Sequence, residues 1–134
     1  MRNLFVDTGA WLALADRHDE HHERAARFYR QRDGRVRWVT SDFVLDELAT
    51  RLSSLRGPAA AVTFVRRLRS KPSHEVLEVD GALFEEALSL MLKFSDHRLS
   101  FTDCSSFALM RELRIPEAFG FDADFTECGF QLLP

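Results

Sequence analysis

Two short apolar runs, near the two ends of the chain, stop at aspartates. The run at 4–6 leads directly into Asp7, and the run at 118–121 leads into Asp122, with Asp124 two residues later. Apolar runs of this length are typical of buried strands. In an open α/β sheet the functional crevice lies at the carboxyl ends of the strands. We therefore expect carboxylates from both ends of the chain to meet at one edge of a sheet.

Strand-like and helix-like segments alternate along the whole chain. The intervening segments are long enough for helices, and their expected N-caps are Asp19, Ser41, Asp80 and Thr102. This alternation favours a parallel sheet, so we predict an α/β fold, a three-layer α/β/α sandwich with a mainly parallel sheet of four or five strands. The predicted strands cover residues 3–6, 36–40, 76–79, 118–121 and 130–133.

Length and composition predict one globular domain. The chain has 134 residues, and no Gly/Ser-rich linker or internal repeat divides it, so residues 1–134 are expected to form a single domain. No leader peptide is recognisable, and no apolar run approaches the roughly 18 residues of a membrane span. The two cysteines, Cys104 and Cys128, form no disulfide framework. Free thiols in a reducing cytoplasm are therefore expected.

Positive charge is distributed unevenly, although the net charge is only −3. All but two of the 18 basic residues are arginines, and they concentrate at 24–37 and 48–74, where Asp33 is the only acid. Arginine is well shaped for forked contacts with phosphate. The two segments are thus either ordinary solvated helix faces or basic flanks that hold a polyanion beside an acidic pocket.

Five carboxylates are the candidate functional residues. Each has an ordinary structural explanation taken alone: a turn or helix cap for Asp7 and Asp124, and a favourable helix-dipole position for Asp103. Together they are harder to explain, because clustered carboxylates cannot all ionise without a cation. Ligands that are all oxygen point to Mg²⁺ or Mn²⁺ rather than zinc. The candidate residues are Asp7, Glu47, Asp103, Asp122 and Asp124.

The spacing of these acids, together with their flanking residues, resembles the PIN domain family. The matching segments are 4–11, 41–48, 101–103 and 121–130, which span nearly the whole chain. The pattern is similar in particular to small single-domain VapC-type toxins. The resemblance implies a Rossmann-like fold and metal-dependent ribonuclease activity. It further implies that four acids form the site, with a fifth as an accessory: Asp7, Glu47, Asp103 and Asp122, and the accessory Asp124. It also implies an RNA substrate, a cognate antitoxin and a homodimer.

A mechanism follows from this resemblance as a hypothesis. Asp7, Asp103 and Asp122 would hold the metal while Glu47 binds it or orients the attacking water, leaving a 5′-phosphate and a 3′-hydroxyl. Flanking phosphates would contact arginines, for which the candidates are Arg24, Arg27, Arg51 and Arg56.

Other interpretations are weaker. Most of the phenylalanines are expected to pack in the core, and the histidines at 18, 21 and 22 to lie at a solvated helix start. A phosphatase of the haloacid-dehalogenase type would need a second aspartate where Gly9 stands. Two alternatives stay open: a housekeeping RNA-processing nuclease, and a PIN-fold module that binds RNA or protein without catalysis.

Overall fold

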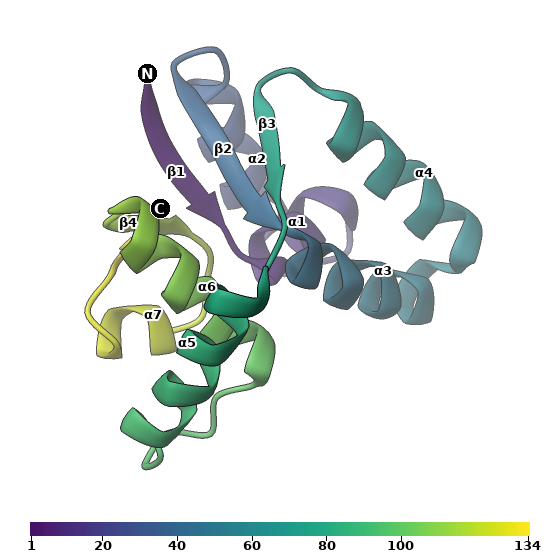
Figure 1. Cartoon of the computed structure of the whole chain (residues 1–134). Helices are drawn as coiled ribbons and strands as arrows, with labels where there is room; N and C mark the ends of the chain where they lie inside the picture. Colours follow the sequence, from purple (N-terminus) through teal and green to yellow (C-terminus); the bar gives the residue numbers. More distant parts are fainter.

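The computed structural model describes residues 1–134, and its centre is a five-stranded sheet (Figure 1). All neighbouring strands are parallel, in the order β3-β2-β1-β4-β5. The predicted α/β class with a mainly parallel sheet is confirmed. The strands are β1 (Arg2–Val6), β2 (Val36–Ser41), β3 (His74–Leu77), β4 (Glu117–Phe119) and β5 (Gln131–Leu133).

Seven helices flank this sheet. The pair α3 and α4 packs side by side and extends away from the sheet, whereas α5 and α6 pack together below it (Figure 1). Gly57 makes the turn between α3 and α4 with a φ of 89°, which a glycine adopts without steric cost. The helices are α1 (Thr8–Ala15), α2 (His22–Arg32), α3 (Asp42–Arg56), α4 (Pro58–Ser70), α5 (Gly81–Lys93), α6 (Phe101–Leu113) and α7 (Asp124–Glu127). No helix is long and apolar enough to cross a membrane.

The central strand β1 is exposed at its first two residues and buried over its last three. Leu4 and Val6 are fully inaccessible, as expected for a parallel strand with other elements on both faces. At its carboxyl end, the Trp11 indole N–H donates to Thr40 Oγ1 (3.3 Å), and that hydroxyl donates to the carbonyl of Val6 (3.0 Å). This buried chain of hydrogen bonds joins α1 to the ends of β1 and β2, and so fixes the edge of the sheet where the acids stand.

Two predicted caps are confirmed and two are wrong. Ser41 accepts from the Val44 N–H (3.1 Å), and Asp80 from the Leu83 N–H (2.9 Å). Ser100, not Thr102, caps α6 because the helix already begins at Phe101. Asp19 accepts from the His21 N–H (2.8 Å) in a local turn, and α2 begins only at His22.

All five strands differ in their bounds from the predicted ranges, and the third and fourth strands differ most. The third strand begins at His74, two residues earlier than expected, because pairing with β2 starts at Trp38 opposite His74. This strand lies at the edge of the sheet and is only half-buried, so polar residues enter it. The fourth strand ends at Phe119 rather than Phe121, which places Asp122 in a loop beyond the strand.

Candidate metal centre

Asp7 is the most buried of the candidate acids. It lies directly after β1 at the N-cap position of α1, and its N–H donates to the carbonyl of Phe119 (3.0 Å). Its side chain makes no capping hydrogen bond, and the residue is only 6% exposed. Burial raises the pKa of Asp7 to about 7, and the charge of Asp103 adds to this rise. The Thr8 N–H offsets part of it, whereas Glu47 and Asp122 raise it further.

Gly120 allows β4 to lie close to Asp7. A Cβ atom at this position would lie 3.2 Å from Asp7 Cβ and 3.6 Å from Asp7 Oδ2. It would also lie 3.6 Å from Leu132 Cδ1, on the opposite neighbour strand. A side chain at Gly120 would therefore push directly on the buried carboxylate.

Asp103 reaches the same region from the first turn of α6. It forms a reciprocal capping box with Ser100: the Asp103 N–H donates to Ser100 Oγ (3.0 Å), and the Ser100 N–H donates to Asp103 Oδ2 (3.2 Å). Burial raises the pKa of Asp103, its hydrogen bonds with Ser100 lower it, and the nearby charges of Asp122 and Glu47 raise it again. The capping box thus fixes one carboxylate oxygen and leaves the other free for a ligand.

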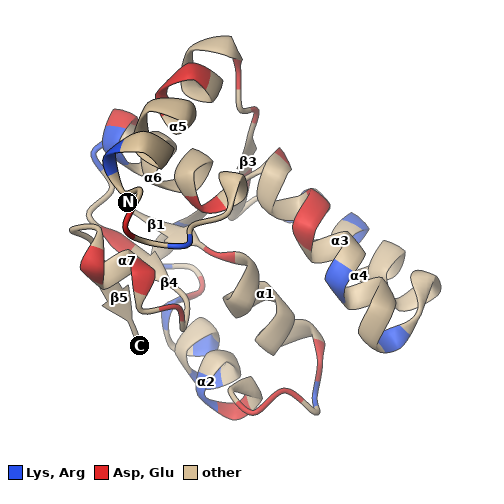
Figure 2. Cartoon of the chain, turned by 90° about the horizontal axis from the view of Figure 1, so that it is seen from below, with Lys and Arg blue, Asp and Glu red and all other residues tan.

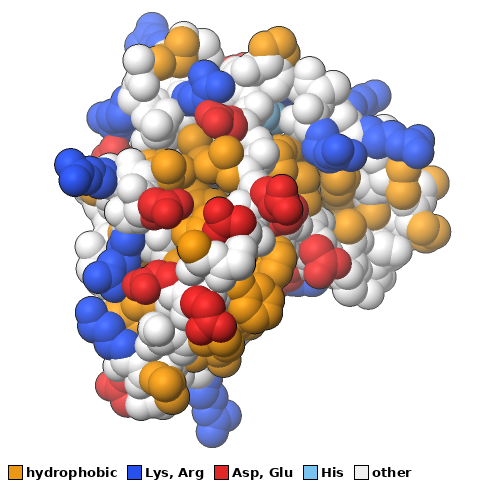
Figure 3. Space-filling model, viewed as in Figure 1, with side chains coloured by type: hydrophobic (Ala, Val, Ile, Leu, Met, Phe, Trp, Pro, Cys, Tyr) orange, Lys and Arg blue, Asp and Glu red, His pale blue; other side chains and the backbone are white.

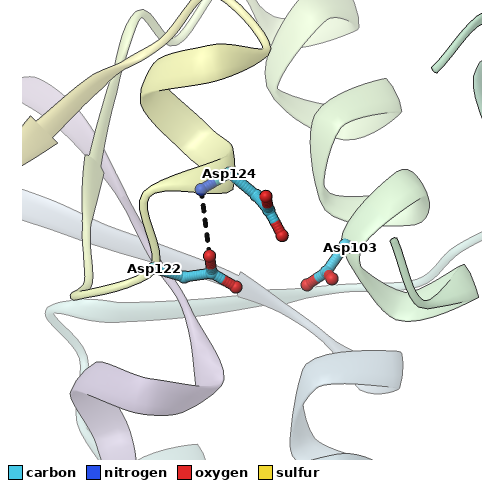
Figure 4. A group of neighbouring side chains, drawn as sticks. All are labelled: Asp103, Asp122 and Asp124. Carbon is cyan, nitrogen blue, oxygen red and sulfur yellow. Dashed lines mark hydrogen bonds between the residues drawn. The ribbon is translucent and has the colours of Figure 1, made fainter. Parts of the chain in front are cut away.

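Asp122 and Asp124 come from the loop after β4 and the start of α7. The backbone N–H of Asp124 donates to Asp122 Oδ1 (2.9 Å), as Figure 4 shows, and this bond holds the Asp122 side chain beside that of Asp124. One carboxylate oxygen from each of these three aspartates lies within 4.8 Å of the other two. Burial raises the pKa of Asp124, with Asp122 as the next cause. The residue expected to be an accessory therefore belongs to the tightest cluster.

Glu47 completes the arrangement from α3. It is half-buried and lines a cleft of about 400 Å³ together with the four aspartates. Figure 2 views the molecule from below, toward the carboxyl ends of the strands, and shows acidic segments on α3 and α7. All five predicted site residues thus lie around one cleft. Asp7 and Glu47 lie outside the closest group of three.

Two arginines and a phenylalanine also line the cleft, and only one of them was a candidate. Arg51, on α3, is the one predicted phosphate contact that lines the cleft. Arg98 and Phe121 line it as well but were not predicted. Phe121 is partly buried and packs against the core, and its ring stacks on His21 at a centroid distance of 4.2 Å. The position of Phe121 directly before Asp122 was the available signal, whereas Arg98 lies in a loop that the sequence pattern leaves unplaced.

The other candidate arginines do not line the cleft, although the guanidinium of Arg24 lies 5.7 Å from the ring centroid of Phe121, which does. Arg56 pairs with Asp16 (2.8 Å), at the far end of α3. Arg24 donates to the carbonyl of Pro134 (3.1 Å). Arg27 lies on the outer surface of α2, in a separate depression.

The donor set fits a hard divalent cation. Only carboxylate oxygens converge, without histidine or cysteine, which favours Mg²⁺ or Mn²⁺ over a softer metal. Burial, together with the neighbouring carboxylates, raises the pKa of Asp7, so its charged form is unfavourable in the absence of a cation. Next to Asp7, the buried hydroxyl of Thr8 has no hydrogen-bond partner.

The fold and the cleft together define an α/β protein with a carboxylate site at the carboxyl ends of its parallel strands. The sequence matches the PIN domain family model over residues 4–131. The chain belongs to the PIN domain family, as the sequence pattern predicted.

Within this family the chain is similar to VapC toxins. It is 35% identical over 127 residues to the 23S rRNA-specific endonuclease VapC20 of Mycobacterium tuberculosis, covering 95% of each chain. The crystal structure of M. tuberculosis VapC20, described as a sarcin-ricin loop cleaving toxin, superposes with a TM-score of 0.88 over 95% of each chain. The fold is also shared, at 15% identity and a TM-score of 0.70, by DNA-bound VapBC from Salmonella typhimurium, over 99% of this chain and 98% of that one.

These similarities confirm the prediction of a VapC-type toxin endoribonuclease. They favour the toxin over a housekeeping nuclease or a non-catalytic binding module, the two alternatives that the sequence left open.

Proposed function

We propose that this protein is a Mg²⁺- or Mn²⁺-dependent toxin that hydrolyses 23S rRNA in its sarcin-ricin loop. The observation that supports this most is the convergence of five carboxylates in one cleft. The substrate is inferred from VapC20, which is 35% identical over nearly the whole chain.

Each carboxylate has a proposed role. Asp103, Asp122 and Asp124 would hold the cation, because their oxygens already lie within 4.8 Å of one another. A cation bound there would activate water and stabilise negative charge on the phosphodiester. Glu47, half-buried on α3 at the same cleft, would orient the attacking water and accept its proton. Asp7 would ionise fully only beside a cation, since its pKa is about 7 without one.

We further propose a protein antitoxin and a homodimer as partners, in the cytoplasm. Helix α5 offers a surface for the dimer, because its outer face exposes large apolar side chains. Leu92 is 80% exposed and is accompanied by Phe84, Leu88 and Met91.

The surface charge is also unevenly distributed. In Figure 3 acidic side chains occupy the middle of the face shown, and Lys and Arg lie mostly toward its edges.

The function is tested by cleavage of purified ribosomes and total RNA with Mg²⁺ or Mn²⁺. We expect a discrete 23S fragment with the wild type and none with Asp103→Asn, which retains an acceptor for the Ser100 N–H and so preserves the helix cap. Glu47→Gln should lose activity as well. Asp46→Asn is the matched control because Asp46 is adjacent on α3 but exposed and outside the cleft.

The result separates the alternatives. Cleavage of tRNA or mRNA instead of 23S rRNA would overturn the proposal that 23S rRNA is the substrate. If the protein is folded and the RNA stays intact in every lane with either metal, the proposed nuclease activity is overturned and a binding module is favoured.

A further inference from the structure

The acidic cleft contains two arginines that have no acidic partner. Arg51 and Arg98 are the only basic residues that line it, and both are exposed. Neither belongs to any ion pair or side-chain hydrogen bond of the structure. The ion pairs instead involve Arg2, His21, Arg37, Arg56, Lys71 and His97.

The two arginines come from different walls of the cleft. Arg51 follows Glu47 by one turn of α3, so both side chains lie on the same helix face. Arg98 lies in the connection between α5 and α6, two residues before the helix cap Ser100, which is bonded to Asp103. Arg51 is thus placed near Glu47, and Arg98 near Asp103. Since α3 and α6 pack against each other, both pairs belong to the same cleft.

A nucleic acid approaching this cleft meets strong repulsion. Even with one divalent cation bound, five carboxylates leave the cleft negative, and every RNA phosphate adds another negative charge. Cations on the walls are therefore needed to hold phosphates next to the metal. A guanidinium is suited to this because it binds a phosphate through two parallel N–H donors and stays charged at any physiological pH.

We propose that Arg51 and Arg98 are the phosphate-binding residues of the cleft and hold the RNA phosphates adjacent to the scissile one. This inference rests on the proposed ribonuclease function and adds to it the residues that position the substrate. It also separates these two arginines from the rest of the arginine-rich surface.

The test compares three single variants, Arg51→Gln, Arg98→Gln and Arg66→Gln. Arg66 is the matched control because it is exposed on α4, outside the cleft, and forms no ion pair. The rate of RNA cleavage is measured as kcat/KM at several salt concentrations, on the RNA segment that the wild type cuts.

We expect Arg51→Gln and Arg98→Gln each to lower kcat/KM by roughly 10- to 100-fold, as for the loss of a charge-assisted phosphate contact, with Arg66→Gln close to the wild type. A loss of one phosphate contact should reduce the slope of log kcat/KM against log salt by about 0.7 for single-stranded RNA, because the salt dependence of binding enters kcat/KM. A merely structural role for the arginines would leave this slope unchanged.

Neutral methylphosphonates, placed one at a time along the RNA, identify the phosphates that are contacted. A methylphosphonate that weakens cleavage by the wild type should cause no further loss with the arginine variant that has lost the same contact. If the effects of variant and methylphosphonate simply add at every position, the contact is absent and the proposal fails.

Failure of the proposal is distinct from failure of the function. A wild type that cleaves RNA, with both cleft variants equally active or with Arg66→Gln equally impaired, overturns the phosphate-binding role only. If the folded wild type cleaves no RNA, the function fails, and binding of a synthetic sarcin-ricin loop RNA is measured by fluorescence anisotropy. If only the two cleft variants lose RNA binding, the phosphate-binding role of the arginines is supported. If their binding is unchanged, that role is overturned.

Discussion

Asp7 is expected to destabilise the metal-free protein at neutral and alkaline pH. Raising its pKa from 3.8 to about 7 corresponds, at 1.36 kcal/mol per pKa unit, to about 4 kcal/mol. Between these two values the folded protein keeps a proton that the unfolded chain has released. Stability therefore falls as the pH rises through this window, and the loss is complete above pH 7.

Replacing Asp7 with asparagine removes this penalty. The asparagine side chain stays neutral at every pH, so Asp7→Asn should exceed the wild type in stability by up to about 4 kcal/mol at pH 8 and by less than about 2 kcal/mol at pH 5. The same variant should be inactive. A functional acid that is buried at a cost should behave in this way: its removal stabilises the fold and abolishes the activity.

The assay is urea unfolding followed by circular dichroism, in EDTA, at both pH values. Asp46→Asn is the control because Asp46 is exposed, and it should show no such dependence on pH. Adding Mg²⁺ in place of EDTA should stabilise the wild type more than Asp7→Asn, since a ligand that binds only the folded state stabilises it. If Asp7→Asn is no more stable than the wild type at pH 8, the penalty on the buried charge of Asp7 does not exist.

Three further predictions test the packing around the site. Gly120→Ala should lower the free energy of unfolding by about 1–3 kcal/mol through overpacking and should also lower cleavage, because its Cβ would lie 3.2 Å from Asp7 Cβ. Its control is Gly9→Ala, whose Cβ would have only a 4.0 Å contact, so this variant should be as stable as the wild type or more stable in thermal unfolding. An equal loss of stability in both variants would contradict the overpacking argument. Ser41→Ala should lower the unfolding free energy by about 1 kcal/mol through loss of the α3 cap, and an unchanged urea midpoint would show that the cap is unimportant. Cys104 is buried and burial raises its pKa to about 11, so a thiol reagent should modify Cys128 first, and rapid reaction of both thiols in the native protein would refute this.

Much of the site could be predicted because its residues follow strong local signals. Asp7 directly follows an apolar strand, and Asp103 lies in the first turn of a helix, as the sequence indicated. Errors arose where a local signal had two solutions. Thr102 and Ser100 can both cap a helix, and only the actual start at Phe101 selects Ser100.

The sequence by itself determined the alternation of strands and helices, the α/β class and the identity of the five acids, because apolar periodicity and capping residues act over a few positions. Only the tertiary structure decided how close those acids lie. The parallel order of the sheet places β1 beside β4, and the short α7 then brings a carboxylate oxygen of Asp124 within 4.8 Å of one from Asp103. It also decided which arginine faces the cleft, since Arg51 and Arg56 lie on the same helix yet only Arg56 is paired with an acid. Such relations depend on the packing of distant segments, which no local pattern encodes.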